Sequence, residues 1–174
     1  MKDQSLLVLL VEDSEDDALL IIRELQKGGY HPEYERVETA NTMKKALKEK
    51  PWNIILCDYN MPNFSAPSAI ALLKESHIDI PVIIVSGTIG EETAIECMRL
   101  GAKDYIMKGK YYRLCPAIAR ELEETKVRKK QKQSEEMLLL IQRAVEGSSD
   151  AIGISDPKGR HYYQNKAFTD LLGY

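Results

Sequence analysis

Charged and hydroxyl side chains directly follow the apolar segments of this 174-residue chain. They stand where runs of branched apolar residues stop, and they are Glu12, Asp13, Asp58, Ser86 and Lys108. If these runs are parallel strands, their carboxyl ends meet at one edge of a sheet, which is where open α/β sheets bind ligands. We therefore expect three carboxylates, a hydroxyl and an ammonium group to converge on one site.

A divalent cation is the group that such a site is expected to hold. Three convergent carboxylates repel one another unless positive charge compensates them. Magnesium binds one or two carboxylates, keeps several waters and accepts phosphate oxygens. We expect Mg2+ (or Mn2+) to be bound directly by Asp13 and Asp58 and through water by Glu12. The backbone carbonyl of Asn60 is expected to supply a further oxygen.

Asp58 is the residue that we expect to act as a nucleophile on phosphorus. Such an attack needs positive charge on the equatorial oxygens of the transferring group, which the metal and Lys108 would provide. The hydroxyl of Ser86 would then donate a hydrogen bond to a phosphoryl oxygen. Each residue alone also has a structural explanation, since Asp58 could form a turn before Pro62 and Lys108 could be a solvated surface residue. Their occurrence at successive strand ends favours the functional interpretation.

The elements that position these residues can be predicted from apolar periodicity. Runs at residues 6–11, 54–57 and 82–85 are typical of buried parallel strands, and weaker runs at 34–38 and 104–107 suit the two edges of a sheet. Between the runs, apolar residues at helical spacing predict four helices with buried stripes, which are Ala18, Ile22 and Leu25; Met43, Ala46 and Leu47; Ile70 and Leu73; and Ile95 and Met98. This alternation predicts a doubly wound α/β sheet.

Helix ends are marked by four signals. Ser14 followed by Asp17 predicts a capping box, and Pro67 suits the first turn of a helix. Gly28 and Gly101 stand where a C-terminal glycine belongs.

A last helix is predicted from Leu114, Ile118 and Leu122. Residues 120–136 mix both charges with Gln and contain no Gly or Pro, so we expect this helix to continue, in preference to a floppy charged linker. An extended helix of this kind could pair with a copy of itself, although its apolar seam is weak.

The pattern of residue types changes after Gly147. A strand at 151–155, a turn at 156–159, a run at 161–163 and a helix from Lys166 are predicted. A unit this short cannot enclose its own core, so we expect it to be the opening of a second domain.

Composition excludes several other classes of protein. A net charge of -3 gives no reason to expect binding to nucleic acid or to a membrane. The three cysteines lack the paired spacing of a zinc or redox site and are expected to be buried apolar residues. The N-terminus leads into too few apolar residues for a signal peptide or a membrane span, so a cytoplasmic location is expected.

Residues 5–123 closely resemble the receiver domain of two-component response regulators. The motifs that carry the resemblance are Leu-Val-Glu-Asp (10–13), Asp-Tyr-Asn-Met-Pro (58–62), Val-Ser-Gly-Thr (85–88) and Asp-Tyr-Ile-Met-Lys (104–108). The resemblance implies a flavodoxin-like (βα)5 fold with strand order 2-1-3-4-5. It also implies phosphotransfer to Asp58 from the phosphohistidine of a histidine kinase or phosphotransfer protein, followed by slow hydrolysis that the residues at Asn60 and Thr88 tune.

The same resemblance implies a switch. Ser86 would move to bond the phosphoryl group, Tyr105 would turn inward into the vacated space, and the output face would be helix four, strand five and helix five. Two positions depart from the family: Ala66 stands where many members have Gly, and Gly109 follows Lys108 where many have Pro. Loop geometry is expected to differ there, whereas the acceptor chemistry is untouched.

The end of the chain, residues 139–174, resembles the beginning of a PAS sensor domain. The resemblance is carried by Ala-Val-Glu-Gly-Ser-Ser-Asp-Ala-Ile, then Asn165, Ala167, Phe168 and a final Leu-Leu-Gly-Tyr. It implies a receiver domain at 1–123, a helical linker at 124–146 and a partial α+β PAS segment at 147–174. The intact protein is expected to continue into an output module such as a histidine kinase.

Two other functions use similar residues. Phosphatases of the haloacid-dehalogenase type also place an Asp nucleophile and magnesium at a strand end, but they need a second acid two residues on, where this chain has Asn60. An interaction module that works without phosphorylation would not need every acceptor, metal and lysine position filled. The phosphodonor is expected to be another protein, because His31, His77 and His161 lack the context of a phosphohistidine site.

Overall fold

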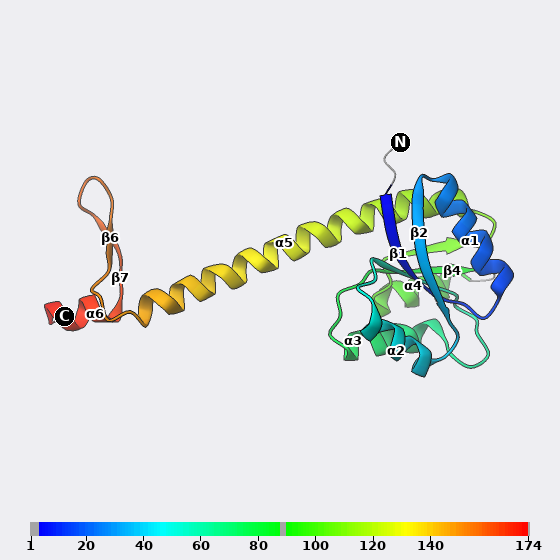
Figure 1. Cartoon of the computed structure of the whole chain (residues 1–174), viewed down its shortest axis with the longest axis horizontal. Coiled ribbons are helices and arrows are strands. Elements are labelled where there is room, and N and C mark those ends of the chain that lie inside the picture. The colour runs from blue at the N-terminus through cyan, green and yellow to red at the C-terminus, as the bar shows by residue number, and fades with distance from the viewer. Residues whose placement is uncertain (1–3, 88–89, 174) are drawn as a thin grey trace. The chain divides into compact units, whose positions relative to one another are not determined.

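The protein is described by a computed structural model that covers residues 4–87 and 90–173. The chain divides into two compact units, Met1–Lys126 and Val127–Tyr174. The first unit contains a five-stranded sheet flanked by helices, and the second contains a two-stranded sheet and a short helix (Figure 1).

The sheet of the first unit is parallel, with the strand order β2-β1-β3-β4-β5. Its strands are β1 (Gln4–Val11), β2 (Tyr30–Val37), β3 (Ile54–Cys57), β4 (Val82–Ser86) and β5 (Asp104–Met107). The helices are α1 (Glu15–Lys27), α2 (Ala40–Glu49), α3 (Ala66–Glu75), α4 (Glu91–Leu100) and α5 (Leu114–Glu146), with a 3-10 turn, η1 (Tyr111–Arg113), before the last. The predicted doubly wound, flavodoxin-like fold and its strand order are confirmed.

Two apolar layers hold the helices against the sheet. On one face, α1 and the start of α5 pack on alternate residues of the strands, with Leu25 and Ile118 completely buried. On the other face, α2, α3 and α4 pack on the intervening strand residues, and Met43 is completely buried there. Because both faces are covered, the central strands read as unbroken apolar runs.

Strand β2 is longer than predicted. It begins at Tyr30 and not at residue 34, and it ends at Val37 and not at Glu38. All eight of its residues pair with β1, from Gln4 opposite Tyr30 to Val11 opposite Val37. The first half of β2 contains polar residues and Pro32, so it lacks the apolar pattern that predicts a buried strand. An edge strand tolerates both kinds of residue.

The predicted buried stripe of α4 is wrong. The side chains of Ile95 and Met98 are 48% and 46% exposed, whereas Cys97 is completely buried. Helical spacing identifies residues that share a face, but it does not decide which face meets the sheet. Here the small Cys97 faces the sheet, and the two larger side chains face solvent.

The helix ends match the predictions in part. The hydroxyl of Ser14 accepts a hydrogen bond from the backbone N–H of Asp17 at 3.2 Å, but the N–H of Ser14 donates to Glu12 and not to Asp17. The predicted capping box is therefore only half formed. Gly101 has the left-handed conformation expected of it, with φ of 114°, whereas after α1 that conformation is found at the next residue, Gly29, and not at Gly28. Pro67 lies in the first turn of α3 as predicted.

In the second unit, α5 continues without interruption to Glu146, which confirms the predicted long helix. Two short antiparallel strands follow, β6 (Gly153–Ser155) and β7 (His161–Gln164), and then α6 (Lys166–Leu172). The first strand is two residues shorter than predicted. None of the helices among residues 4–87 and 90–173 has the length and apolar character that a membrane span requires.

Asn165 organises this second unit. Its side chain is completely buried and makes four hydrogen bonds. The oxygen accepts from the backbone N–H groups of Ile152 (2.9 Å) and Phe168 (3.0 Å), and the nitrogen donates to the carbonyls of Val145 and Asp150, both at 2.9 Å. The end of α5, the loop before β6 and the start of α6 are thereby held together.

Candidate functional site

The parallel register brings the polar strand ends to one edge of the sheet. Val11 pairs with Cys57, so the residues that follow each of them, Glu12 and Asp58, lie side by side. Ser86 is the last residue of β4, and Lys108 follows β5 and donates its backbone N–H to the carbonyl of Ser86 at 2.8 Å. The site is therefore assembled from the ends of four neighbouring segments.

Lys108 is the centre of this site. Its ammonium nitrogen lies 2.8 Å from Oδ2 of Asp58, 3.0 Å from Oε2 of Glu12 and 2.5 Å from Oδ2 of Asp17. Burial acts to lower the pKa of Lys108, but the hydrogen bonds to Asp17, Asp58 and Glu12 outweigh it and raise that pKa well above its ordinary value. The ammonium group is therefore fully charged at neutral pH.

Glu12 is almost entirely buried, with 1% of its surface exposed. Burial raises the pKa of its carboxyl group, while the hydrogen bonds from Lys108 and from the N–H of Ser14 oppose that rise. Arg36 supports the same turn from outside, because its guanidinium donates to the backbone carbonyls of Glu12 (3.0 Å) and Asp13 (3.2 Å).

The acidic groups outnumber the positive charge. Glu12, Asp13 and Asp58 each present a carboxylate oxygen, and these oxygens lie within 4.8 Å of one another. The carboxylate of Asp17 also contacts the ammonium group of Lys108 and is the fourth acidic group of the cluster. One ammonium group cannot neutralise four carboxylates, so the cluster attracts a further cation. Oxygen donors of this kind, with Asp13 exposed and so accessible to a hydrated ion, fit Mg2+.

Asp58 itself is 8% exposed, and both of its oxygens are engaged. Oδ2 contacts Lys108, and Oδ1 accepts the backbone N–H of Asn60 at 3.3 Å. The backbone of Asn60 thus lies against the carboxylate, while its side chain is exposed. Ordered donors on both oxygens fix the orientation of this carboxylate.

Ser86 and Tyr105 lie on the neighbouring strands β4 and β5. Both hydroxyl groups are buried, and neither has a hydrogen-bond partner within the described parts of the chain. The ring of Tyr105 packs against the core that includes Cys97, and burial raises the pKa of its hydroxyl group. A buried hydroxyl without a partner costs about 1–3 kcal/mol, so both groups are poised to bond to something else.

Asp17 is the residue that sequence reasoning missed. The sequence accounts for it as part of the acidic first turn of α1. The signal that identifies it is its place in the first turn of α1, which begins just after the carboxyl end of β1 and so lies at the same edge of the sheet. Only the folded chain brings Lys108 to it, across 91 residues.

The two departures from the family pattern have clear structural consequences. Gly109 has φ of 88°, a conformation that favours glycine, in the turn where Lys110 donates to the carbonyl of Met107. Ala66 is completely buried at the start of α3. Thr88 lies outside the described residues.

The other polar and nucleophilic groups are already accounted for by their neighbours. Cys57 and Cys97 are buried and Cys115 is half-buried, and none of the three forms a disulfide. Burial raises the pKa of each thiol.

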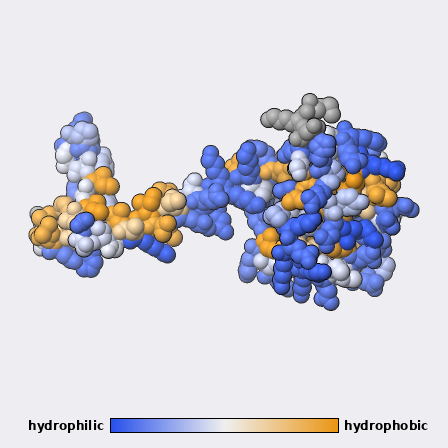
Figure 2. Space-filling view, in the orientation of Figure 1, coloured by the Kyte–Doolittle hydropathy of each residue, from blue (hydrophilic) through white to orange (hydrophobic). Residues whose placement is uncertain are grey.

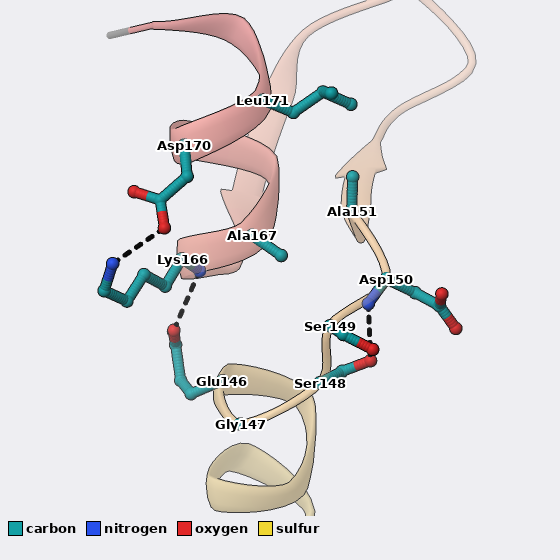
Figure 3. A pocket seen from close by; sticks show the side chains of 10 residues that line it. All are labelled: Glu146, Gly147, Ser148, Ser149, Asp150, Ala151, Lys166, Ala167, Asp170 and Leu171. Carbon is teal, nitrogen blue, oxygen red and sulfur yellow. Dashed lines mark hydrogen bonds and ion pairs between the residues drawn. The ribbon is translucent and has the colours of Figure 1, made fainter.

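Figure 3 shows a hollow in the second unit between the end of α5 and α6. There the ammonium group of Lys166 pairs with Asp170 at 2.7 Å, and the backbone N–H of Lys166 donates to Glu146. These contacts engage Lys166, Asp170 and Glu146 within the second unit.

Comparisons with known proteins agree with this geometry. The family model described as "Response regulator receiver domain" matches residues 8–119. The chain is 29% identical over 101 residues to the response regulator protein FleR of Pseudomonas aeruginosa, and 31% identical over 104 residues to the transcriptional regulatory protein ZraR of Escherichia coli. Each match covers 58% of this chain but only 21% or 22% of the relative, so the chain spans about a fifth of the length of these proteins.

Solved structures show the same fold. The receiver domain of NtrX from Brucella abortus is 28% identical, with a TM-score of 0.60, over 67% of this chain and 98% of that domain. The signal receiver domain of a Luxo repressor protein from Vibrio parahaemolyticus is 25% identical, with a TM-score of 0.64, over 72% of this chain and 95% of that domain. The sequence relatives and the solved structures therefore match this chain to the same kind of domain.

Proposed function

Because the chain belongs to the response regulator receiver domain family, we propose that Asp58 accepts a phosphoryl group from the phosphohistidine of a histidine kinase or phosphotransfer protein. The observation that carries this proposal is the contact of Lys108 with Asp58 at 2.8 Å inside a cluster with excess negative charge. An oxygen of Asp58 attacks phosphorus, the bond from phosphorus to the imidazole nitrogen breaks, and that nitrogen keeps the electron pair. Lys108 stabilises the charge that develops on the phosphoryl oxygens.

The metal in this proposal is Mg2+ (or Mn2+), held by Asp13, Asp58 and the backbone carbonyl of Asn60, with Glu12 acting through water. When bound, it supplies positive charge to the phosphoryl oxygens and offsets the repulsion among the carboxylates. Support comes from the separation of the carboxylate oxygens, which is within 4.8 Å, and from the exposure of Asp13. Asp17 supports the acceptor indirectly, because its carboxylate also contacts the ammonium group of Lys108.

The proposed switch uses Ser86 and Tyr105. After transfer, the Ser86 hydroxyl donates to a phosphoryl oxygen, and the inward position of Tyr105 is stabilised relative to its outward one. Phosphorylation shifts this equilibrium only by its preference for one state over the other. The unpartnered hydroxyl of Ser86 supports the proposal, since it gains a partner when a phosphoryl oxygen is present. The hydroxyl of Tyr105 is already buried without a phosphoryl group. The output face is then α4, β5 and α5, where Ile95 and Met98 are exposed.

We also propose that residues 1–123 are the receiver domain, 124–146 a helical linker and 147–174 the N-terminal part of a PAS domain. The hairpin β6–β7 followed by α6 supports the last of these. Wherever the encoded protein extends past Tyr174, its sequence tests this proposal: a continuation as a PAS domain and an output module such as a histidine kinase would support it, and a different continuation would contradict it.

The remaining partners are proposed on physical grounds. We propose a cytoplasmic location, where histidine kinases deliver phosphoryl groups. Direct binding to nucleic acid is not proposed, because the net charge is -3 and the name of the transcriptional regulator ZraR describes a protein of which the match covers 22%. The exposed apolar residues in the second half of α5 support self-association through that helix.

Incubation with a small phosphodonor and Mg2+ tests the main proposal. Intact-mass measurement should show one added phosphoryl group on the wild-type chain and none on Asp58→Asn. Lys108→Ala should slow the reaction by roughly 100-fold or more, since electrostatic stabilisation of the transferring group is lost. Unchanged labelling of Asp58→Asn would exclude Asp58 as the acceptor.

In the same experiment, Tyr105→Ala should be labelled like the wild-type chain. It should lose the phosphorylation-dependent change in hydrogen exchange of α4 and β5. If that change persisted, Tyr105 would not be part of the switch.

A further inference from the structure

The second half of α5 exposes a band of apolar side chains. Five consecutive residues, from Met137 to Ile141, are each 49% to 66% exposed. The last buried residue of the helix is Thr125, so nothing from Val127 to Glu146 is buried. Figure 2 shows this band as a hydrophobic stretch at the end of the helix. Apolar patches of this kind mark interaction surfaces.

The residues that form a continuous seam along this part of the helix follow a 3.5-residue repeat. They are separated alternately by four and three positions, and they are Val127, Gln131, Ser134, Leu138, Ile141 and Val145. This is the spacing at which two helices pack side by side as a coiled coil. Gln131 and Ser134 make the middle of the seam polar. Polar seam residues reduce affinity but fix the register of two paired helices.

Charges beside the seam identify the partner. In a parallel pair of identical helices, the residue before one seam position faces the residue five positions later on the other helix. Applied to Gln131, this rule places Lys130 opposite Glu135 of the second copy. This pair is attractive, and symmetry forms it twice.

The antiparallel arrangement lacks these attractions. Matching all six seam residues in that direction places Val127 opposite Val145 and Ser134 opposite Leu138. The flanking residues that then meet are Glu135 with its own copy, which repel each other, and Lys130 with the uncharged Ala144. The charges beside the seam therefore favour the parallel arrangement over the antiparallel one.

We infer that a second copy of this chain covers the seam, in parallel and in register, between Val127 and Val145. The inference deepens the self-association proposed for α5, and it does not depend on phosphorylation of Asp58. A dimer of this kind holds the two copies of the segment after Glu146 at the same end of a shared helix pair. Any rotation or shift of α5 that phosphorylation causes is then delivered to both copies together.

Sedimentation of the 174-residue chain tests whether the dimer forms. The wild-type chain should sediment as a dimer, and Leu138→Asp should raise the dissociation constant about 100-fold, because it places a charge in the seam. Leu140→Asp is the matched control, since Leu140 has nearly the same exposure (62% against 66%) but lies off the seam. A monomeric wild-type chain, or equal effects of the two variants, would overturn the proposed surface.

Cysteine cross-linking tests the direction. Ile141→Cys alone and Val127→Cys alone should each form a disulfide-linked dimer, because a parallel register places each residue against its own copy. Leu140→Cys and the wild-type chain, whose own cysteines are buried or half-buried, are the controls. Cross-linking only when Gln131→Cys is mixed with Ile141→Cys would show an antiparallel pair and contradict the inference. Labelling of Asp58 by a phosphodonor should be the same in all of these variants.

Charge exchange tests the register. Lys130→Glu should weaken the dimer about tenfold, since two attractive pairs become repulsive. The double variant Lys130→Glu with Glu135→Lys should recover most of that loss. The same exchange at Lys132 and Glu136, which form an ion pair within one helix at 4.0 Å, should leave the dimer unchanged. Equal losses in both exchanged variants would contradict the parallel register.

Discussion

Each unit of the molecule contains one dominant buried polar centre, and the two centres are built on opposite principles. In the first unit, Lys108 holds three carboxylates and the cluster keeps an excess of negative charge. In the second, the amide of Asn165 is neutral and uses both of its donors and both of its acceptor positions on backbone groups.

This difference distinguishes a polar centre that can bind a ligand from one that only stabilises the fold. A buried polar group that is fully hydrogen-bonded holds elements together and leaves nothing for a ligand. A cluster with uncompensated charge and unpartnered hydroxyls, such as that of Ser86, destabilises the fold until a ligand binds. The carboxylate cluster therefore lowers the stability of the fold, whereas Asn165 raises it.

The largest effect expected from this contrast is at Asn165. Asn165→Ala removes four hydrogen bonds and should destabilise β6, β7 and α6 by about 3 kcal/mol. Hydrogen exchange of those amides should rise to that of an unfolded segment, while exchange in β1 stays unchanged. Gln164→Ala is the neighbouring control, since its single side-chain bond to Thr169 is worth at most about 1 kcal/mol. Equal effects at the two positions would remove the contrast.

Magnesium should act on the first unit alone. At ten times its dissociation constant, Mg2+ should raise the free energy of unfolding by about 1.4 kcal/mol, because it binds only the folded cluster. The single tryptophan, Trp52, is buried in the first unit and reports its unfolding in urea. The increase should vanish in Asp13→Asn and persist in Asn165→Ala. An increase that survives Asp13→Asn would place the ion elsewhere.

The smallest effect is expected at Asp17. Asp17 and Asp16 both lie in the first turn of α1 and interact alike with the helix dipole, but only Asp17 contacts Lys108. Asp17→Asn should therefore cost about 0.5 kcal/mol more than Asp16→Asn, a small difference because the carboxyl group is about a third exposed. Urea unfolding followed at Trp52 measures both variants. Identical values would mean that Asp17 is only a helix-end charge.

Much of this molecule could be predicted from the sequence. The alternation of strands and helices in the doubly wound sheet is confirmed, because apolar runs and helical periodicity report burial directly. The strand order, which the family resemblance implied, is confirmed as well. The long helix is confirmed because residues 120–136 contain no Gly or Pro to end it. The start of β2 was missed, since an edge strand needs no apolar run on its open side. The orientation of α4 was also missed, because the spacing of Ile95 and Met98 is the same whether they face the sheet or solvent.

The sequence by itself determined which chemical groups stand at the ends of the strands. It also determined that these groups meet, since a parallel sheet brings the carboxyl ends of its strands to the same edge. Only the tertiary structure decided how those groups share their charges. Lys108 meets Asp17 and Asp58 over separations of 91 and 50 residues, and such distances leave no periodic signal in the chain. Local pattern follows from the geometry of one element, whereas a charge network depends on the packing of several elements against one another.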